Sequence, residues 1–581
     1  MRTKKGAAVL ATGAALALVL GACGDSGGDE PTDTTSGAAE ETEGGGAEGE
    51  AGILTEGDGD LFQVKATPRD QLEQGGQLRR AVSELPPQWN PMHVNGNNAD
   101  YTDIRDAMSP ATWDYNGEGS PVPNENYLLD FTDETVDGQQ VITLNLNPDA
   151  VWNSGDPINW EDYQASLTAC NGENAEFQCV QTGPYEQIES VEQGETEFDV
   201  VITFKETYPD WSSLVSSVVP AESVADAATF NEGWLEFPAD WFTGPYKVDN
   251  LDEAQQVLTL VPNENWWGPA PMLDEIQFRV VAPDATGTAF QNNEIDVFDV
   301  GPDPNAYALA QTVSGAEIRE AKGPNWRHFT INSTAGLLQD QVIRQAIQRG
   351  IDRQAIAESD LAGLPGEKKP LNNHIFMENQ EGFVDNGSEY GYDPERAMAD
   401  LEEAGWVLNE DTGIREKDGE PLAVKFSVLT GVGASENEGQ LAQAQLKEIG
   451  IDLELVQTPV DEFGPALEAG DFEIMAFSWI GTPYPMNGLA QLYGDPSTNT
   501  SNYAKLNNPE LNELIKQIDV ETDPAARIDL ANEADVMIWE SGHTLPLYQR
   551  PELVATVSNL ANFGATGFST TRAENWGFVS E

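Results

Sequence analysis

Hydrophobic and polar positions alternate at two different periods along this chain. Apolar residues at every second position predict a half-buried strand over 142–146 and another over 451–455. Apolar residues at three-to-four spacing predict an amphipathic helix over 342–351. Asp393 followed by Pro394 marks a second helix start, and Gly405 marks its end. Short strands that alternate with capped helices indicate an α/β fold.

The first residues have a different pattern, which predicts export. Three basic residues (Arg2, Lys4 and Lys5) precede an apolar run over 7–20, too short to span a bilayer, and small residues then lead to Cys23. This arrangement resembles a bacterial lipobox, in which the cysteine thiol receives a diacylglyceryl group. We therefore expect a signal peptide over 1–22, lipidation of Cys23 and a membrane anchor of two acyl chains. An ordinary signal peptide, cut elsewhere, is the alternative.

The segment 23–60 is rich in Gly, Ser, Thr, Asp and Glu and contains almost no large apolar residue. Such a sequence buries too little surface to offset its conformational entropy, and like charges extend it. We expect an acidic, disordered stalk. It would hold a folded body away from the lipid.

The length of 581 residues predicts two or three domains in the body. The net charge of −70 argues against nucleic acid and anionic lipid surfaces as partners, since both are negative. A high-salt habitat would explain this charge, because salt screens the self-repulsion. An acidic exported protein from an ordinary source is the alternative.

Three cysteines are present, and Cys23 is assigned to the lipid. The remaining pair, Cys170 and Cys179, predicts a disulfide in an exported protein. The chain has only four histidines, and they are scattered without ligand spacing. We therefore predict neither a metal site nor a cofactor.

Several sequence blocks occur in a characteristic order over nearly the whole body. They include Thr-Gly-Pro-Tyr at 243–246, Arg-Gln-Ala at 344–346, Tyr-Asp-Pro at 392–394 and Gly-Asp-Phe at 470–472, with longer blocks at 144–163, 263–268 and 446–479. The ordered set resembles the extracellular solute-binding proteins (family 5) of peptide-type ABC importers, the dipeptide/oligopeptide-binding family, and an actinobacterial source is expected. Most of these residues form turns, helix ends and close packing, so they indicate the fold more than the ligand.

The resemblance implies an α/β, two-lobed clamp of the periplasmic-binding-protein type with an extra subdomain on lobe I. The expected boundaries are lobe I over 61–112, the extra subdomain over 113–240, lobe I again over 241–325, lobe II over 326–544 and a return to lobe I over 545–581. Closure of the lobes around a solute is a hinge motion.

The resemblance also implies a cleft that holds an extended peptide by backbone hydrogen bonds. In the family, an Asp that follows a strand-end Trp often pairs with the peptide ammonium, but Thr482 stands at that position here. Asp100 and Asp495 are other acids that could approach the amine. The expected ligand-binding residues are Trp479, Gly481, Thr482, Tyr484, Trp326, His328 and Asn97.

These inferences lead to a non-enzymatic receptor on the outer face of the cytoplasmic membrane. It would act as a monomer that delivers oligopeptides to the subunits of an ABC permease. A protein of the same fold that binds a glycolipid or cell-envelope precursor is the alternative. A nickel or haem carrier also exists within the family, although the few histidines argue against nickel. An exported hydrolase is disfavoured, because the sequence contains no Gly-x-Ser-x-Gly or His-Glu-x-x-His motif.

Overall fold

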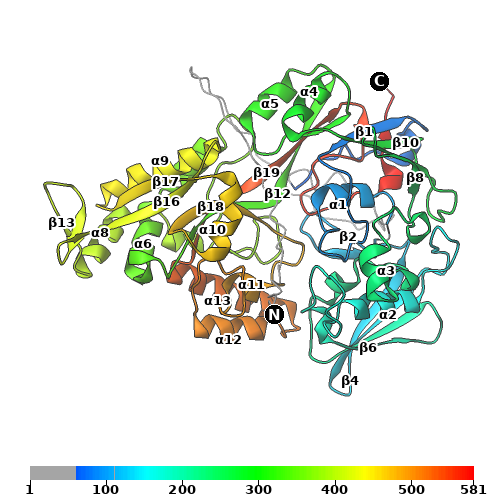
Figure 1. Cartoon of the computed structure of the whole chain (residues 1–581), viewed down its shortest axis with the longest axis horizontal. Coiled ribbons are helices and arrows are strands. Elements are labelled where there is room, and N and C mark those ends of the chain that lie inside the picture. Colours follow the sequence, from blue (N-terminus) through cyan, green and yellow to red (C-terminus); the bar gives the residue numbers. More distant parts are fainter. Residues whose placement is uncertain (1–60, 110, 581) are drawn as a thin grey trace, which may run out of the picture.

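The computed structural model describes residues 61–109 and 111–580. Figure 1 shows two bodies that are joined by two long strands, β12 (Ala316–Ile331) and β19 (Thr544–Val557). We call the body around the sheet of β1 lobe I and the body around the sheet of β16 lobe II. A smaller sheet-containing part, drawn below lobe I in Figure 1, is called the subdomain.

Lobe I is built around a four-stranded sheet in the order β1-β10-β9-β8. β1 runs parallel to β10, and the other neighbours are antiparallel. Leu78, Phe278 and Trp576 are buried in one core, so both ends of the described chain and its middle are packed together. The elements of lobe I are β1 (Gln77–Val82), α1 (Ala99–Arg105), β8 (Tyr246–Asp252), β9 (Val257–Pro262), β10 (Glu275–Val280), β20 (Leu560–Ala561) and β21 (Gly577–Phe578).

The subdomain is an antiparallel sheet in the order β4-β5-β7-β6 with its own core. The strand predicted over 142–146 lies inside β5, where its three apolar residues are buried. Asn159 and Asp162 form a capping box at the start of α2. The elements of this region are β2 (Trp113–Tyr115), β3 (Pro121–Pro123), β4 (Leu128–Val136), β5 (Gln139–Leu146), α2 (Trp160–Ala169), β6 (Ile188–Gln193), β7 (Asp199–Phe204) and α3 (Ala227–Glu232).

Lobe II contains a six-stranded mixed sheet in the order β11-β19-β12-β18-β16-β17. The helix predicted over 342–351 is α6, and the predicted cap of Asp393 and Pro394 opens α8. Besides β12 and β19, its strands are β11 (Val297–Asp299), β16 (Ala423–Leu429), β17 (Asp452–Thr458) and β18 (Ile474–Ile480). A separate small sheet consists of β13 (Val407–Leu408), β14 (Arg415–Lys417) and β15 (Glu420–Pro421).

Helices flank this sheet, which confirms the predicted mixture of strands and helices; in Figure 1 most of them lie on the lobe II side, and α4 and α5 lie above β12 and β19. They are α4 (Thr286–Gln291), α5 (Pro304–Gln311), α6 (Gln341–Gly350), α7 (Arg353–Asp360), α8 (Pro394–Glu403), α9 (Gly433–Glu448), α10 (Phe463–Ala469), α11 (Leu489–Tyr493), α12 (Pro509–Ile518) and α13 (Pro524–Ser541).

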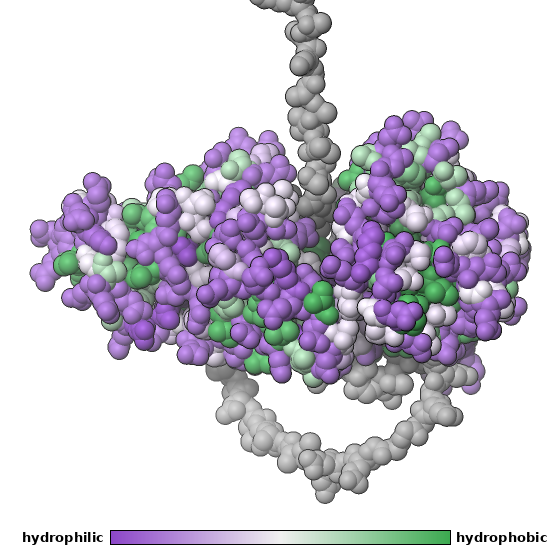
Figure 2. Space-filling view, turned by 90° about the horizontal axis from the view of Figure 1, so that it is seen from below, coloured by the Kyte–Doolittle hydropathy of each residue, from purple (hydrophilic) through white to green (hydrophobic). Residues whose placement is uncertain are grey.

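The surface is predominantly polar. Figure 2 shows hydrophilic residues over most of the visible face, with hydrophobic residues in smaller groups between them. Within the described ranges, no helix combines the length and the apolar character that a membrane span needs. The predicted signal peptide, Cys23 and the stalk lie outside the described residues.

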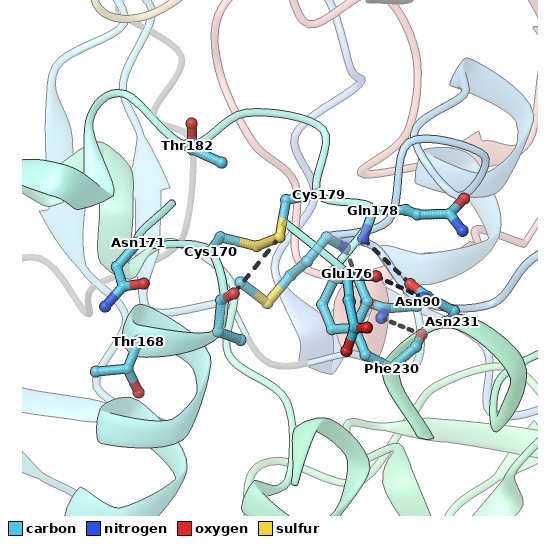
Figure 3. Close-up of a disulfide and its surroundings, with 12 residues drawn as sticks. Asn90, Thr168, Cys170, Asn171, Glu176, Gln178, Cys179, Thr182, Phe230 and Asn231 are labelled. Atoms are coloured by element: carbon cyan, nitrogen blue, oxygen red, sulfur yellow. Dashed lines mark hydrogen bonds between the residues drawn. A yellow bond between two sulfur atoms is a disulfide. The ribbon is translucent and has the colours of Figure 1, made fainter. Parts of the chain in front are cut away.

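The predicted disulfide between Cys170 and Cys179 is confirmed, with a Cα–Cα distance of 5.8 Å. Figure 3 shows how it closes the loop that follows α2. Asn231 fixes the same loop, because its amide donates to the carbonyl oxygen of Glu176 at 2.8 Å and accepts from the backbone N–H of Gln178 at 3.1 Å. The disulfide thus ties the loop to the end of α2, and the hydrogen bonds of Asn231 attach it to α3.

We predict that replacing both cysteines by serine lowers the free energy of unfolding by roughly 2–3 kcal/mol, because the unfolded chain regains the entropy of a short closed loop. Urea unfolding, monitored by tryptophan fluorescence, measures this loss. Adding a reductant to the wild type should produce the same shift in the midpoint and should leave the double variant unchanged. Equal midpoints for the wild type and the variant would contradict the prediction.

Candidate functional site

A cavity of about 860 Å³ lies where lobe I meets β12 and β19. Its walls come from many separate parts of the chain, among them β1 and α1, the segment around β2, residues 124–127 and 216–217 of the subdomain, β11 with the loop after it, the middle of β12 and β19, and the C-terminal segment 563–576. Charged side chains from these parts face the same space, among them Arg80, Asp106, Asp299, Arg550 and Glu552. The site is thus assembled by tertiary structure from distant positions.

Five carboxyl groups on this wall have raised pKa values: those of Asp106, Asp114, Asp299, Glu552 and Glu574. Both Asp106 and Asp299 reach the solvent in the cavity, but the protein atoms around them still desolvate their carboxyl groups. This desolvation, followed by the nearby charge of Asp103, raises the pKa of Asp106 to about 6. Desolvation also raises the pKa of Asp299. Burial raises the pKa of Glu552 to about 7, although this carboxylate accepts hydrogen bonds from the backbone N–H groups of Thr566 and Gly567. A cationic group that entered the cavity would be attracted to these carboxylates.

Positive groups balance part of this charge. Arg80 pairs with Asp103 at 2.9 Å, and its guanidinium lies over the ring of Phe563 at 4.9 Å. Arg572 pairs with Asp114 at 2.6 Å. Arg550 donates one long hydrogen bond of 3.4 Å to the hydroxyl of Ser478. The cavity therefore presents both signs of charge to a ligand.

Of the sequence-predicted residues, Tyr484 makes a contact between lobe II and the subdomain, and Gly481 and Thr482 precede it in the same segment. The N–H of Gly481 donates to the carbonyl oxygen of Pro324 at 2.7 Å. Thr482 is exposed, and its hydroxyl accepts from the N–H of Tyr484 at 3.2 Å. The hydroxyl of Tyr484 accepts from Ser212 at 3.0 Å. Pro324 lines the cavity, so this contact lies next to it.

The predicted aromatic residues lie in packed surroundings. Trp326 is 3% exposed and packs against Phe568. His328 is fully buried, and burial lowers its pKa well below the ordinary value, so that the ring is neutral. Trp479 is partly exposed and stacks on Tyr503 with ring centroids 5.9 Å apart. The packed rings of Trp326, His328 and Trp479 support the segment that follows β18.

Asn97 is exposed and precedes Asn98, whose side chain caps α1. Asp100 accepts from the N–H of Ser83 at 2.9 Å, and Asp495 accepts from the N–H of Ser497 at 2.8 Å. None of these residues lines the 860 Å³ cavity, and neither do the other six predicted binding residues.

The charged residues that do line the cavity were missed by the sequence reasoning. Asp106 directly follows α1, and Asp299 ends β11. Arg550 and Glu552 lie two residues apart on β19. The chain contains 99 acidic residues, so no acidic position stands out in the sequence. In the part of the chain that the structure describes, no group of three or more His, Cys, Asp or Glu side chains is arranged to hold a metal ion.

The raised pKa of Glu552 predicts a pH dependence of stability. Between its ordinary value of 4.5 and about 7, the folded protein keeps a proton that the unfolded chain has released. This stabilisation is complete below pH 4.5 and is lost as the pH rises through about 7. Glu552→Gln has no proton to lose, so its unfolding free energy should gain up to about 3 kcal/mol relative to the wild type over this range.

Urea unfolding of both proteins at several pH values from 4.5 to 7.5 measures the difference. Glu513→Gln serves as the control, because the Glu513 side chain is 70% exposed on α12, and it should follow the wild-type curve. Parallel curves for Glu552→Gln and the wild type would show that this carboxyl group does not hold its proton in the folded state.

Comparison with known proteins identifies the family. Residues 125–501 match the model of the middle part of the bacterial extracellular solute-binding proteins, family 5. The chain is 35% identical over 513 residues to the oligopeptide-binding protein OppA of Mycobacterium tuberculosis, covering 87% of this chain and 85% of that protein.

Solved structures agree with this assignment. The periplasmic EDTA-binding protein EppA superposes with a TM-score of 0.80 at 25% identity, covering 92% of this chain and 100% of that one. The oligopeptide-binding protein AppA of Bacillus subtilis, solved with a nonapeptide, superposes with a TM-score of 0.68 at 19% identity, covering 88% of this chain and 100% of that one. The chain belongs to the bacterial extracellular solute-binding proteins of family 5, a non-enzymatic family that serves ABC import.

Proposed function

We propose that this protein captures oligopeptides in the 860 Å³ cavity and delivers them to the permease subunits of an ABC importer. The observation that carries this proposal is the similarity to mycobacterial OppA, which extends over 87% of the chain. Lobe movement about β12 and β19 would admit the peptide and enclose it, as in other two-lobed binding proteins.

The chemistry of the cavity supports a peptide. Its volume of about 860 Å³ lies in the range of about 300–1,000 Å³ that is typical of ligand pockets. A peptide carries an ammonium, a carboxylate and amides, and the wall offers carboxylates, guanidinium groups and the amides of Asn126 and Asn325. A lipid chain in this space would remove charged side chains from water without giving them partners, which is unfavourable. The wall therefore favours a peptide over the glycolipid alternative.

Mass spectrometry of the purified protein under native conditions tests the ligand class. We expect a ladder of co-purified masses that fragment as peptides, and added synthetic peptides of three to nine residues should displace them. A single lipid mass would contradict the peptide proposal, and so would a small chelating molecule such as EDTA, which the protein EppA binds. In either case the family assignment would stand, because it rests on the sequence match.

We further propose that the mature chain is a monomer that begins at Cys23 and is held on the outer face of the cytoplasmic membrane by lipid. Cells that express the full chain and grow with labelled palmitate should incorporate the label into this protein. Cys23→Ser should abolish the label and release the protein from the membrane fraction. Unchanged labelling of the variant would show that the cysteine is not the lipid attachment site.

A further inference from the structure

We propose that Asp210 and Arg527 form an interlobe clasp, a buried ion pair that holds lobe II closed against the subdomain. Asp210 directly precedes the 3₁₀ helix Trp211–Val215 of the subdomain. Arg527 lies in the first turns of α13 in lobe II. The two residues are 317 positions apart, and they lie away from the long strands β12 and β19 that join the bodies.

The geometry of the pair is bidentate. The two terminal nitrogens of Arg527 donate to the two carboxylate oxygens of Asp210 at 2.7 and 2.6 Å. The side chains are only 7% and 10% exposed, so water screens the pair little. The third donor, Nε of Arg527, binds the carbonyl oxygen of Ile518 at the end of α12, which fixes the guanidinium in this orientation.

A second contact between the same two bodies supports the clasp. The hydroxyl of Tyr484, in the segment that follows β18, lies 3.0 Å from the hydroxyl of Ser212 and 3.3 Å from that of Tyr115. Ser212 is two residues from Asp210, so both contacts meet one short segment of the subdomain. Tyr115 also lines the large cavity. The clasp is therefore built next to the space in which the ligand is proposed to bind.

The energetic consequence depends on the state of the lobes. When the lobes separate, Asp210 and Arg527 regain water, so the pair contributes to the balance between closed and open states. Removing one partner leaves the other charge buried and unpaired in the closed state alone, which favours opening. The clasp therefore stabilises the closed state independently of any ligand, and it slows ligand release more than ligand capture.

Two single variants, Asp210→Asn and Arg527→Gln, test the clasp in the purified mature protein. Small-angle X-ray scattering should show a larger radius of gyration than for the wild type. Hydrogen exchange of the backbone N–H groups in 211–215 and of Gly481, Thr482 and Tyr484 should accelerate at least tenfold. Scattering and exchange identical to the wild type would overturn the proposal. Circular dichroism and urea unfolding show whether each variant is folded.

Two further variants provide the controls. Glu513→Gln breaks an ion pair within α12 that joins no two bodies, and it should leave scattering and exchange unchanged. The double variant Asp210→Leu/Arg527→Met has no unpaired buried charge, so it should open less than either single variant. If the increase in radius of gyration of the double variant equals the sum of the increases of the two single variants, the two side chains act independently and there is no clasp.

These readouts need no ligand, so they remain valid if the proposed peptide ligand is wrong. Should peptide binding be established, a synthetic peptide used as the probe should leave Asp210→Asn at least tenfold faster than it leaves the wild type. Its association rate should change much less. Equal dissociation rates would show that the pair does not hold the closed state around the ligand.

Discussion

The antiparallel pairing of β12 with β19 is the constraint on which the rest of the structure depends. Both strands run from lobe I into the sheet of lobe II, so one ladder fixes how the two bodies face each other. The register shifts between Lys322 and Trp326, where Gly323, Pro324 and Asn325 leave the ladder. Such an irregularity bends and twists a strand pair locally. The irregular part of this ladder lies at the wall of the cavity.

The same ladder also assembles the site. Arg550 and Glu552 lie on β19 and line the cavity, next to the part of β12 that does not pair with β19. The C-terminal segment completes this wall because Arg319, which is 1% exposed on β12, donates to the carbonyl oxygens of Leu560 and Phe563. Backbone carbonyl oxygens satisfy the two terminal nitrogens of this buried guanidinium, which offsets part of the cost of burying its charge. A structural interaction inside lobe I thus positions residues that face the ligand space.

Several of the few basic residues are used in the interior of the protein. The chain has 29 Lys and Arg against 99 Asp and Glu. Several arginines lie in the interior and donate to backbone carbonyl oxygens: Arg319, Arg344, Arg353, Arg415 and Arg527, each at most 5% exposed. They add nothing to the solvated face, but six carboxylates among the described residues are buried as well, among them Asp162, Asp296 and Glu438, so the net charge of the surface stays close to that of the whole composition. The Asp210–Arg527 pair is one of the places where this internal use of arginine joins two bodies.

The sequence by itself determined the fold class, the family, the disulfide and many local elements. Strand β5, helix α6 and the Asp393 cap were predictable because their signals are local: alternation, helical spacing and a side chain that binds its own helix. The cavity wall and the pairing of Asp210 with Arg527 were decided only by tertiary structure. Their members lie in distant parts of the chain, and neither Asp106 nor Asp299 differs locally from the many solvated carboxylates. Long-range contacts leave no local pattern, so only the folded chain brings them together.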